Sequence, residues 1–247
     1  MSERLQIADM AAELLARIRQ NSPRVHCLTN TVVQKFTADG LSALGALPSM
    51  TASVEEIADF AGKADALLVN LGTLDAQRRQ VIEAALAAFK PRAQPWVLDP
   101  VMCHLSSTRL TFAQALLRHG PTALRGNSAE IAALQPPRDA LVVETGTQDR
   151  ISRNGQTVTI ANGHPWMAAV TGTGCLSGAV LAAFLAVEPQ HPLRAAASAF
   201  LVIGVAAELA TRQARGPGTF EPAFLDALAT VDANDLAARG RADHAQH

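Results

Sequence analysis

Two glycines and a cysteine stand together where a loop of this 247-residue chain is expected to turn into a helix. The segment reads Gly172-Thr173-Gly174-Cys175, and apolar residues recur at helical spacing from Leu176 to Val187, so we expect the helix to begin at Cys175. The first N–H groups of a helix lack partners within it, and glycine lets a phosphate approach the backbone closely. The segment predicts either an anion-binding turn or a tight loop-to-helix junction with a small buried cysteine.

A carboxylate and an Asn-x-x-Glu pair follow two apolar strands. Asp99 ends the run that begins at Trp96, and Pro100 stops the strand there. An acidic group in this place can hold Mg²⁺ through water, or it can cap the turn before the proline. Asn127 and Glu130 could likewise position a hydrated metal ion. The same spacing forms a helix capping box, which the local pattern favours slightly.

Arg125 and Thr145 carry groups that suit a nucleotide. The planar guanidinium of Arg125 can bind phosphate through two parallel hydrogen bonds, although a surface salt bridge is the simpler interpretation. Thr145 and Gly146 supply a hydroxyl and a flexible backbone after an apolar run. That combination suits either a nucleotide or a plain turn.

The three cysteines, Cys27, Cys103 and Cys175, suggest thiol or zinc chemistry. Neighbouring residues of a strand point to opposite faces, so the His26-Cys27 and Cys103-His104 pairs are badly arranged to share a zinc ion. Cys175 is better placed, because a helix N-terminus lowers the pKa of a thiol and so favours nucleophilic chemistry.

Short strands that alternate with helices must position these residues. The expected strands are Val25–Thr29, Leu47–Thr51, Ala66–Leu71, Trp96–Val101, Ala123–Gly126 and Leu141–Thr145. Such alternation predicts an α/β protein with a mostly parallel central sheet flanked by helices. We also expect an edge hairpin over residues 151–160 and an almost entirely helical chain after Gly172. Since ligands gather beyond the carboxyl ends of parallel strands, the polar residues at those ends should form one site.

Composition limits the kind of partner. The chain carries 21 basic and 22 acidic residues, so no net field favours nucleic acid or an acidic membrane. With 49% hydrophobic residues it can bury a large core, and we expect residues 1–247 to form one domain. The N-terminal segment lacks the apolar stretch of a signal peptide, and we find no uninterrupted apolar run of transmembrane length. A small-molecule partner or another subunit, and a reducing cytoplasm, fit these features.

Several ordered blocks resemble the hydroxyethylthiazole kinase family of the ribokinase-like kinases. They include Val25-His26-Cys27-Leu28-Thr29-Asn30, Asn70-Leu71-Gly72-Thr73-Leu74, Arg125-Gly126-Asn127-Ser128-Ala129-Glu130 and Gly172-Thr173-Gly174-Cys175. The resemblance implies a ribokinase-like three-layer fold and phosphorylation, by ATP with Mg²⁺, of the hydroxyl of 4-methyl-5-(2-hydroxyethyl)thiazole for thiamine salvage. It also implies a homotrimer with active sites at subunit boundaries.

The resemblance assigns binding roles to particular residues. Met50 would contact the thiazole, and Gly172 would line the substrate site. Arg125 and Thr145 would contact ATP. All four lie in segments that match the family in order along the chain.

Catalytic and metal-binding roles follow from the same resemblance. Asp99 and Glu130 would organise the magnesium ion and its waters. Thr173, Gly174 and Cys175 would form the anion hole that steadies the transferring phosphoryl group. Cys175 stands where many ribokinase-like enzymes carry an aspartate base, and its thiol, with a pKa lowered by the helix N-terminus, would accept a proton or orient the hydroxyl.

The chain departs from the family pattern in two main places. The connection between Ile131 and Leu141 is short, where the family has a longer one with a helix, and Met102-Cys103-His104 replaces a glycine-rich turn. Three alternatives therefore stay open. They are a ligand-binding or assembly protein on the same fold, a kinase for another small alcohol, and a thiol hydrolase that uses Cys175.

Overall fold

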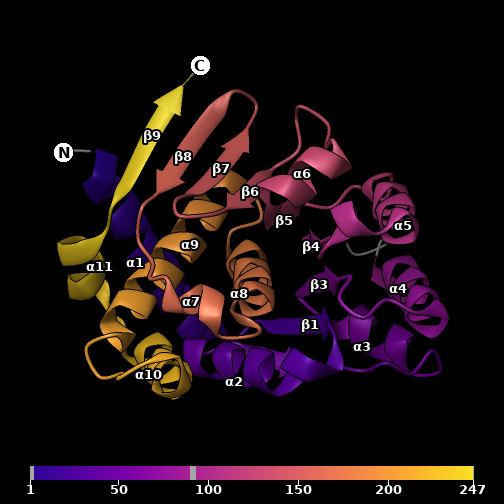
Figure 1. Ribbon diagram of the computed structural model, residues 1–247, viewed down its shortest axis with the longest axis horizontal. Coiled ribbons are helices and arrows are strands. Elements are labelled where there is room, and N and C mark those ends of the chain that lie inside the picture. Colours follow the sequence, from indigo (N-terminus) through magenta and orange to yellow (C-terminus); the bar gives the residue numbers. More distant parts are fainter. Residues whose placement is uncertain (1–2, 90–92, 247) are drawn as a thin grey trace.

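The computed structural model describes residues 3–89 and 93–246, which are built around one nine-stranded sheet (Figure 1). The strand order is β2-β1-β3-β4-β5-β6-β7-β8-β9. Strands β1 to β6 pair in parallel, whereas β7, β8 and β9 join the sheet antiparallel. The strands span Arg24–Leu28 (β1), Leu47–Ser49 (β2), Ala66–Asn70 (β3), Trp96–Asp99 (β4), Ala123–Asn127 (β5), Val142–Thr145 (β6), Asp149–Arg153 (β7), Gln156–Ile160 (β8) and Ala242–Gln246 (β9).

Helices cover both faces of the sheet and produce three layers (Figure 1). One face is covered by α3 (Ile57–Lys63), α4 (Ala76–Phe89), α5 (Ser107–Leu117) and α6 (Ser128–Leu134). The other face is covered by α1 (Glu3–Asn21), α2 (Gln34–Leu44), α8 (Thr173–Val187) and α9 (Pro192–Ala210). Helices α10 (Pro217–Thr230) and α11 (Ala233–Arg239) pack against these helices. Three single turns, η1 (Thr31–Val33), η3 (Cys103–Leu105) and α7 (Trp166–Ala169), complete the described elements. The layered α/β prediction is confirmed.

The expected strands all form, within one or two residues at their ends. Every residue of β3 and β4 is buried, because parallel strands covered by helices on both faces need apolar side chains on both. The expected hairpin is β7–β8, and it turns at Asn154 and Gly155, which both have positive φ as a two-residue hairpin turn requires.

One strand escapes the sequence pattern. After Gly172 the chain is helical until β9, which pairs with β8 at the edge of the sheet. Contacts far apart in sequence hold it there, since the Arg241 N–H donates to Asn162 Oδ1 at 2.6 Å and the Arg241 guanidinium pairs with Glu208 at 2.5 Å. The expectation of an almost entirely helical end was therefore wrong at its last segment, because tertiary pairing and not local propensity makes this strand.

The short connection after Ile131 is accommodated by the sheet itself. Strands β6 to β9 present apolar residues such as Ile151 to α9, while Glu144, Arg150 and Thr159 lie opposite one another on the outward face. An antiparallel region with one polar face can meet water directly. A covering helix at residues 135–141 is not required for this part of the sheet to bury its core.

Among the described residues, α9 is the one helix whose length and composition would suit a bilayer. The sequence of this helix is not uninterruptedly apolar, because Ser198 and Glu208 lie within it, but the helix as a whole is long and apolar enough to qualify. Most of α9 is buried inside the protein, where it packs against α1, α8 and α10. A core helix passes the same test of length and composition, so α9 is weak evidence for a membrane span.

Candidate active site

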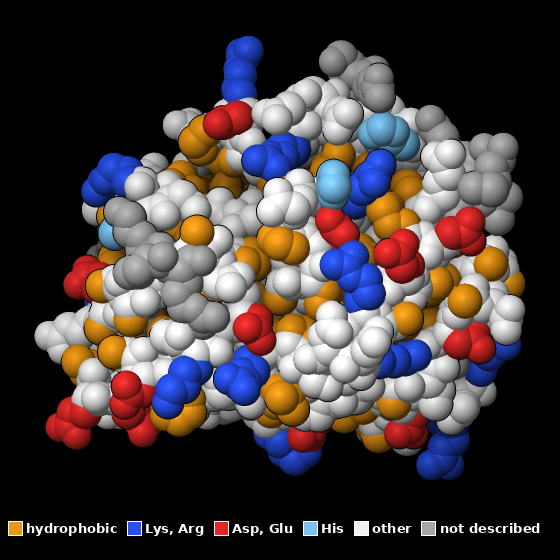
Figure 2. All heavy atoms as spheres, turned by 180° about the vertical axis from the view of Figure 1, so that it is seen from behind, with side chains coloured by type: hydrophobic (Ala, Val, Ile, Leu, Met, Phe, Trp, Pro, Cys, Tyr) orange, Lys and Arg blue, Asp and Glu red, His pale blue; other side chains and the backbone are white. Residues whose placement is uncertain are grey.

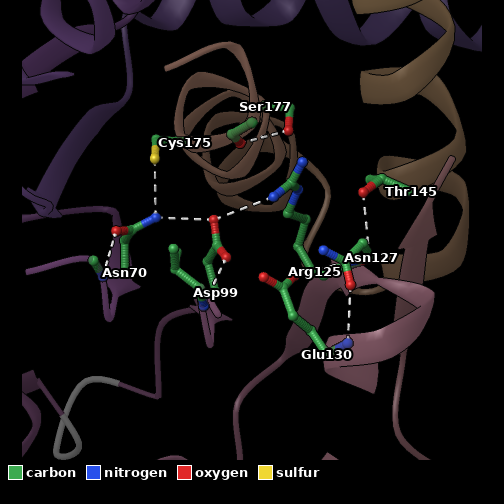
Figure 3. Close-up of polar contacts among 12 residues, drawn as sticks. Asn70, Asp99, Arg125, Asn127, Glu130, Thr145, Cys175 and Ser177 are labelled. Atoms are coloured by element: carbon green, nitrogen blue, oxygen red, sulfur yellow. Dashed lines mark hydrogen bonds and ion pairs between the residues drawn. The ribbon is translucent and has the colours of Figure 1, made fainter. Parts of the chain in front are cut away.

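Polar residues that end four neighbouring parallel strands form the candidate site (Figure 3). Asn70 ends β3 opposite Asp99 of β4, and Asn127 ends β5 opposite Thr145 of β6. The N-terminus of α8 lies beside the first pair, since Asn70 reaches the side chain of Cys175. This is the edge at which open α/β sheets bind ligands.

Asp99 is the most buried charged group of the site, with 0% of its surface exposed. Its Oδ2 accepts a hydrogen bond from Asn70 Nδ2 at 2.9 Å and faces Arg125 Nη1 at 3.5 Å, and its Oδ1 accepts the Val101 N–H at 3.4 Å. Burial raises the pKa of Asp99 to about 6, although Arg125 opposes the rise. The group is thus an ionised, fully buried carboxylate at neutral pH.

Asn70 connects this carboxylate to the thiol of Cys175. Its Nδ2 lies 2.9 Å from Asp99 Oδ2 and 3.3 Å from Cys175 Sγ, and its Oδ1 accepts the Gly72 N–H at 3.0 Å. Asn30 Nδ2 approaches the same sulfur at 3.9 Å. The sequence places Asn70 at a strand end, but only the fold shows that Asn30 converges with it on one thiol.

The predicted lowering of the Cys175 pKa is wrong. Burial raises the pKa of the Cys175 thiol to about 11, and the nearby carboxylate of Asp99 raises it as well, although Arg125 and the hydrogen bond from Asn70 oppose the rise. The sequence pattern shows neither cause, because both the burial of the sulfur and its nearness to a negative charge arise only in the fold. At neutral pH Cys175 is a protonated thiol and neither a ready base nor a ready nucleophile.

The glycine-rich turn begins α8 two residues earlier than expected, at Thr173. Gly172 precedes the helix with φ of 102°, and a Cβ there would lie 2.9 Å from Val33 Cγ1, so this position requires glycine. It also has no side chain to cap the first N–H groups of the helix. Thr173 uses its hydroxyl internally, donating to the Met167 carbonyl at 2.5 Å. The anion-binding capacity of the turn therefore resides in its backbone.

Arg125 lies across the start of α8. A Cβ on Gly174 would come within 3.0 Å of Arg125 Nη2, so the bare backbone of Gly174 makes room for the guanidinium. Only 14% of the Arg125 side chain is exposed, and its ion pair with Asp99 is buried. The surface salt bridge considered from the sequence is thus an internal one, located where an anion at the helix N-terminus would meet a cation.

Glu130 forms the capping box that its spacing predicts. The Glu130 N–H donates to Asn127 Oδ1 at 2.9 Å, and the Asn127 N–H donates to Glu130 Oε2 at 2.8 Å. The second oxygen, Oε1, accepts the Met102 N–H at 2.7 Å, which fastens the loop after β4 to α6. Glu130 is 5% exposed and its charge acts on Asp99, whose pKa it raises. Glu130 therefore caps α6 and also lies close enough to the site to act on Asp99.

Two predicted residues lie farther from this centre. Thr145 is half-buried and donates to the Gly126 carbonyl at 3.3 Å, at the edge formed by β5 and β6. Met50 follows β2, and strands β1 and β3 separate β2 from the strand of Asp99. Within the described residues no three His, Cys, Asp or Glu side chains gather as a metal cage. The structure therefore brings together Asp99, Arg125, Glu130, Gly174 and Cys175, and leaves Met50 outside.

A comparison with models of protein families shows the family of this chain. The hydroxyethylthiazole kinase family matches residues 15–137 and 137–234, with its interruption at the short connection around Pro137. The chain belongs to this family. It is a phosphotransferase by that membership, which the resemblance of its sequence blocks predicted.

Relatives of this family match the chain from end to end. The probable hydroxyethylthiazole kinase of Agrobacterium fabrum is 54% identical over 246 residues, covering 100% of both chains. The solved structure of the hydroxyethylthiazole kinase protein from Pyrococcus horikoshii OT3 superposes with a TM-score of 0.91 at 33% identity, over 96% of this chain and 100% of that one. A ribokinase-like superfamily protein of Enterococcus faecalis V583 shares the fold, with a TM-score of 0.63 at 17% identity over 88% and 93% of the two chains. The ribokinase-like fold is confirmed.

Proposed function

We propose that this chain transfers the terminal phosphoryl group of ATP to the hydroxyl of 4-methyl-5-(2-hydroxyethyl)thiazole, and that the thiazole phosphate serves thiamine salvage. The names of its relatives support the substrate. The observation that carries the proposal is the cluster of the buried Asp99 and Asn70 with the half-buried Cys175, beside the uncapped N-terminus of α8. It combines a place for an alcohol with a place for the anion that the alcohol attacks.

Phosphoryl transfer needs positioning and charge neutralisation more than it needs a strong base. In our proposal the acceptor hydroxyl lies beside the protonated thiol of Cys175, which orients it together with Asn70. The backbone N–H groups from Thr173 to Cys175 hold the oxygens of the transferring group. Arg125 and Thr145 contact the nucleotide, and Gly172 lines the substrate site.

Replacing Cys175 by alanine is expected to leave kinase activity measurable, with kcat within about tenfold of the wild-type value. A protonated thiol supplies orientation but not the roughly 10²–10⁴-fold contribution of a general base. Initial rates at saturating ATP and alcohol test this, with thermal unfolding to verify that the variant is folded. Complete loss of turnover in a folded protein would instead support an obligatory base or covalent nucleophile.

Asp99 and Glu130 suit a hydrated Mg²⁺ ion better than a fully protein-bound one. Each oxygen of Asp99 and each oxygen of Glu130 already accepts one N–H group within the protein. Magnesium keeps several waters and takes one or two carboxylates together with substrate phosphates. When bound, the ion neutralises charge on the phosphates. We assign Asp99 and Glu130 as partners of the ion through its waters.

We propose a homotrimer with active sites between subunits. Two exposed apolar side chains, Leu47 and Phe60, lie together at the free edge of the sheet at β2. A groove of about 290 Å³ between β2 and α3 is lined by Leu47, Pro48 and Phe60. Burying such a patch favours association. Met50 follows this edge, so a neighbouring subunit seated there would complete a substrate pocket that one chain leaves open.

Replacing Leu47 by glutamate is expected to release monomers and to lower activity, because a charge would enter the apolar contact. Leu47 is 52% exposed in the single chain, so the variant should still fold. Light scattering at working concentrations measures the mass. Leu105→Glu is the matched control, since Leu105 is 73% exposed but belongs to η3. A wild-type protein that is monomeric and fully active would overturn the intersubunit site.

Further features fit a cytoplasmic enzyme with small-molecule substrates and one domain over residues 1–247. A single sheet runs through the described chain, and all three cysteines are free. On the face seen in Figure 2, basic and acidic side chains are interspersed, which suits neither nucleic acid nor an acidic membrane.

The direct test supplies the purified protein with ATP, Mg²⁺ and the thiazole alcohol, and measures ADP and the phosphorylated product. We expect both in equal amounts. Hydroxymethylpyrimidine and other small alcohols test the alternative of a different acceptor. Binding of the thiazole without ATP consumption would favour the ligand-binding alternative, and release of hydrolysis products through a Cys175 adduct would favour the thiol hydrolase.

A further inference from the structure

Arg78 joins the ends of two neighbouring strands through hydrogen bonds to their carbonyl groups. It lies in the first turn of α4, and its Nη1 donates to the Thr29 carbonyl at 2.5 Å while its Nη2 donates to the Asn70 carbonyl at 2.8 Å. Thr29 follows β1 and Asn70 ends β3, which are adjacent in the sheet. One guanidinium thus fixes the separation of these two strand ends.

Electrostatics alone would not select an arginine here. A cation in the first turn of a helix meets the positive end of the helix dipole. Burial lowers the pKa of Arg78, and the neighbouring charge of Arg109 lowers it as well, although Asp75 opposes both. These costs are offset by the two charge-assisted hydrogen bonds to carbonyl groups that end strands. The position of Arg78 is therefore best explained by the two strand ends that its hydrogen bonds hold in place.

The two fixed strand ends carry the amides that surround the thiol. Asn70 Nδ2 reaches Cys175 Sγ at 3.3 Å, and Asn30, next to Thr29, approaches it at 3.9 Å. A Cβ on Gly72 would lie 2.8 Å from Asn30 Nδ2 and 3.0 Å from Asn70 Oδ1, so the two amides are packed closely. A change in strand separation would move both amides relative to the sulfur.

We propose that Arg78 is a positioning residue for the acceptor alcohol, acting through the backbones of Thr29 and Asn70 on the amides around Cys175. The inference rests on the proposed function, in which the hydroxyl lies at that thiol. The nucleotide side belongs to β5 and β6, which carry Arg125 and Thr145 and have no bond to Arg78 among those described. Loss of Arg78 should therefore lower kcat/KM for the alcohol and leave the binding of ATP unchanged.

Arg78→Gln is expected to lower kcat/KM for the alcohol about 100-fold, the scale of a displacement of about 1 Å, while the dissociation constant of a non-hydrolysable ATP analogue stays within about twofold. In Arg78→Lys the ammonium group can reach one of the two carbonyls, so kcat/KM for the alcohol should fall less. Guanidinium ion should partly restore Arg78→Ala. The matched control is Arg79→Gln, which removes the same charge from the next residue of α4, where Arg79 packs 5.6 Å from the Phe112 ring centroid.

A second readout does not depend on turnover. Alkylation of Cys175 at pH 9, followed by mass spectrometry of its peptide, should be about tenfold faster in Arg78→Gln and unchanged in Arg79→Gln, since loosened amides expose the sulfur. If the wild type fails to phosphorylate the alcohol, the proposed function fails, and the alkylation rates still test Arg78. A folded Arg78→Gln protein with wild-type alcohol kinetics and wild-type alkylation would overturn the inference. Equal losses for alcohol and ATP would reduce Arg78 to a structural role and overturn it too.

Discussion

Replacing Asp99 by asparagine is expected to lower kcat by about 10³-fold, the largest effect of any single substitution in this site. The change preserves shape but removes the buried charge that faces Arg125 and that we assign to the metal ion. Steady-state rates over a range of Mg²⁺ concentrations measure it. Asp226→Asn, at an exposed position of α10, should keep wild-type rates. A folded Asp99→Asn protein with kcat within tenfold of wild type would contradict the assignment.

The same substitution is expected to change the pH dependence of stability. The pKa of Asp99 is raised from 3.8 to about 6 in the folded state, so its favourable contribution to folding is complete below about pH 4 and is lost as the pH rises through 6. The loss corresponds to roughly 3 kcal/mol. Denaturant unfolding at pH 4.5 and pH 8 measures the free energy of unfolding. Relative to the wild type, that of Asp99→Asn should be higher at pH 8 than at pH 4.5. A difference that does not change with pH would refute the raised pKa.

Replacing Arg125 by glutamine is expected to lower kcat/KM for ATP about 10²–10³-fold, because a charge-assisted contact to phosphate is lost. It should also shift the acidic limb of the pH–rate profile upward, since Arg125 holds the pKa of Asp99 down. Arg125→Lys should recover only part of the activity, because an ammonium lacks the planar fork. Activity profiles from pH 5 to 9 give both effects.

The control for Arg125 is Arg150→Gln, which removes the same charge from the exposed outward side of β7. That variant should keep its ATP kinetics. Unchanged kcat/KM for ATP in Arg125→Gln would place the nucleotide elsewhere, and an unmoved acidic limb would refute the effect of Arg125 on the pKa of Asp99.

Much of the fold could be predicted because its signals are local. Strands such as Ala66–Asn70 are short apolar runs bounded by polar ends, and the Asn154-Gly155 turn marks the hairpin. The same pattern placed Asp99 and Asn70 at one edge of the sheet. By contrast, β9 has no pattern of its own and is held by Arg241 and Asn162, which are far apart in sequence.

The chemistry of the site was less accessible from the sequence. The pKa of Cys175 depends on burial and on the distance to Asp99, neither of which is written in the residues after Gly172. The convergence of Asn30 and Asn70 on that thiol depends on the pairing of β1 with β3. The distance between Met50 and Asp99 likewise depends on the order of the strands in the sheet. Sequence motifs give the order of segments along the chain but not in space.

Isotope tracing tests phosphoryl transfer to the thiazole hydroxyl most directly. The alcohol is labelled with ¹⁸O in its hydroxyl group and incubated with ATP, Mg²⁺ and the protein, and the product is measured by mass spectrometry. We expect a phosphorylated thiazole that keeps the label in its bridging oxygen, formed in step with ADP and nearly absent with Asp99→Asn. Consumption of ATP without that product, or equal product formation by the folded variant, would contradict the proposed reaction at this site.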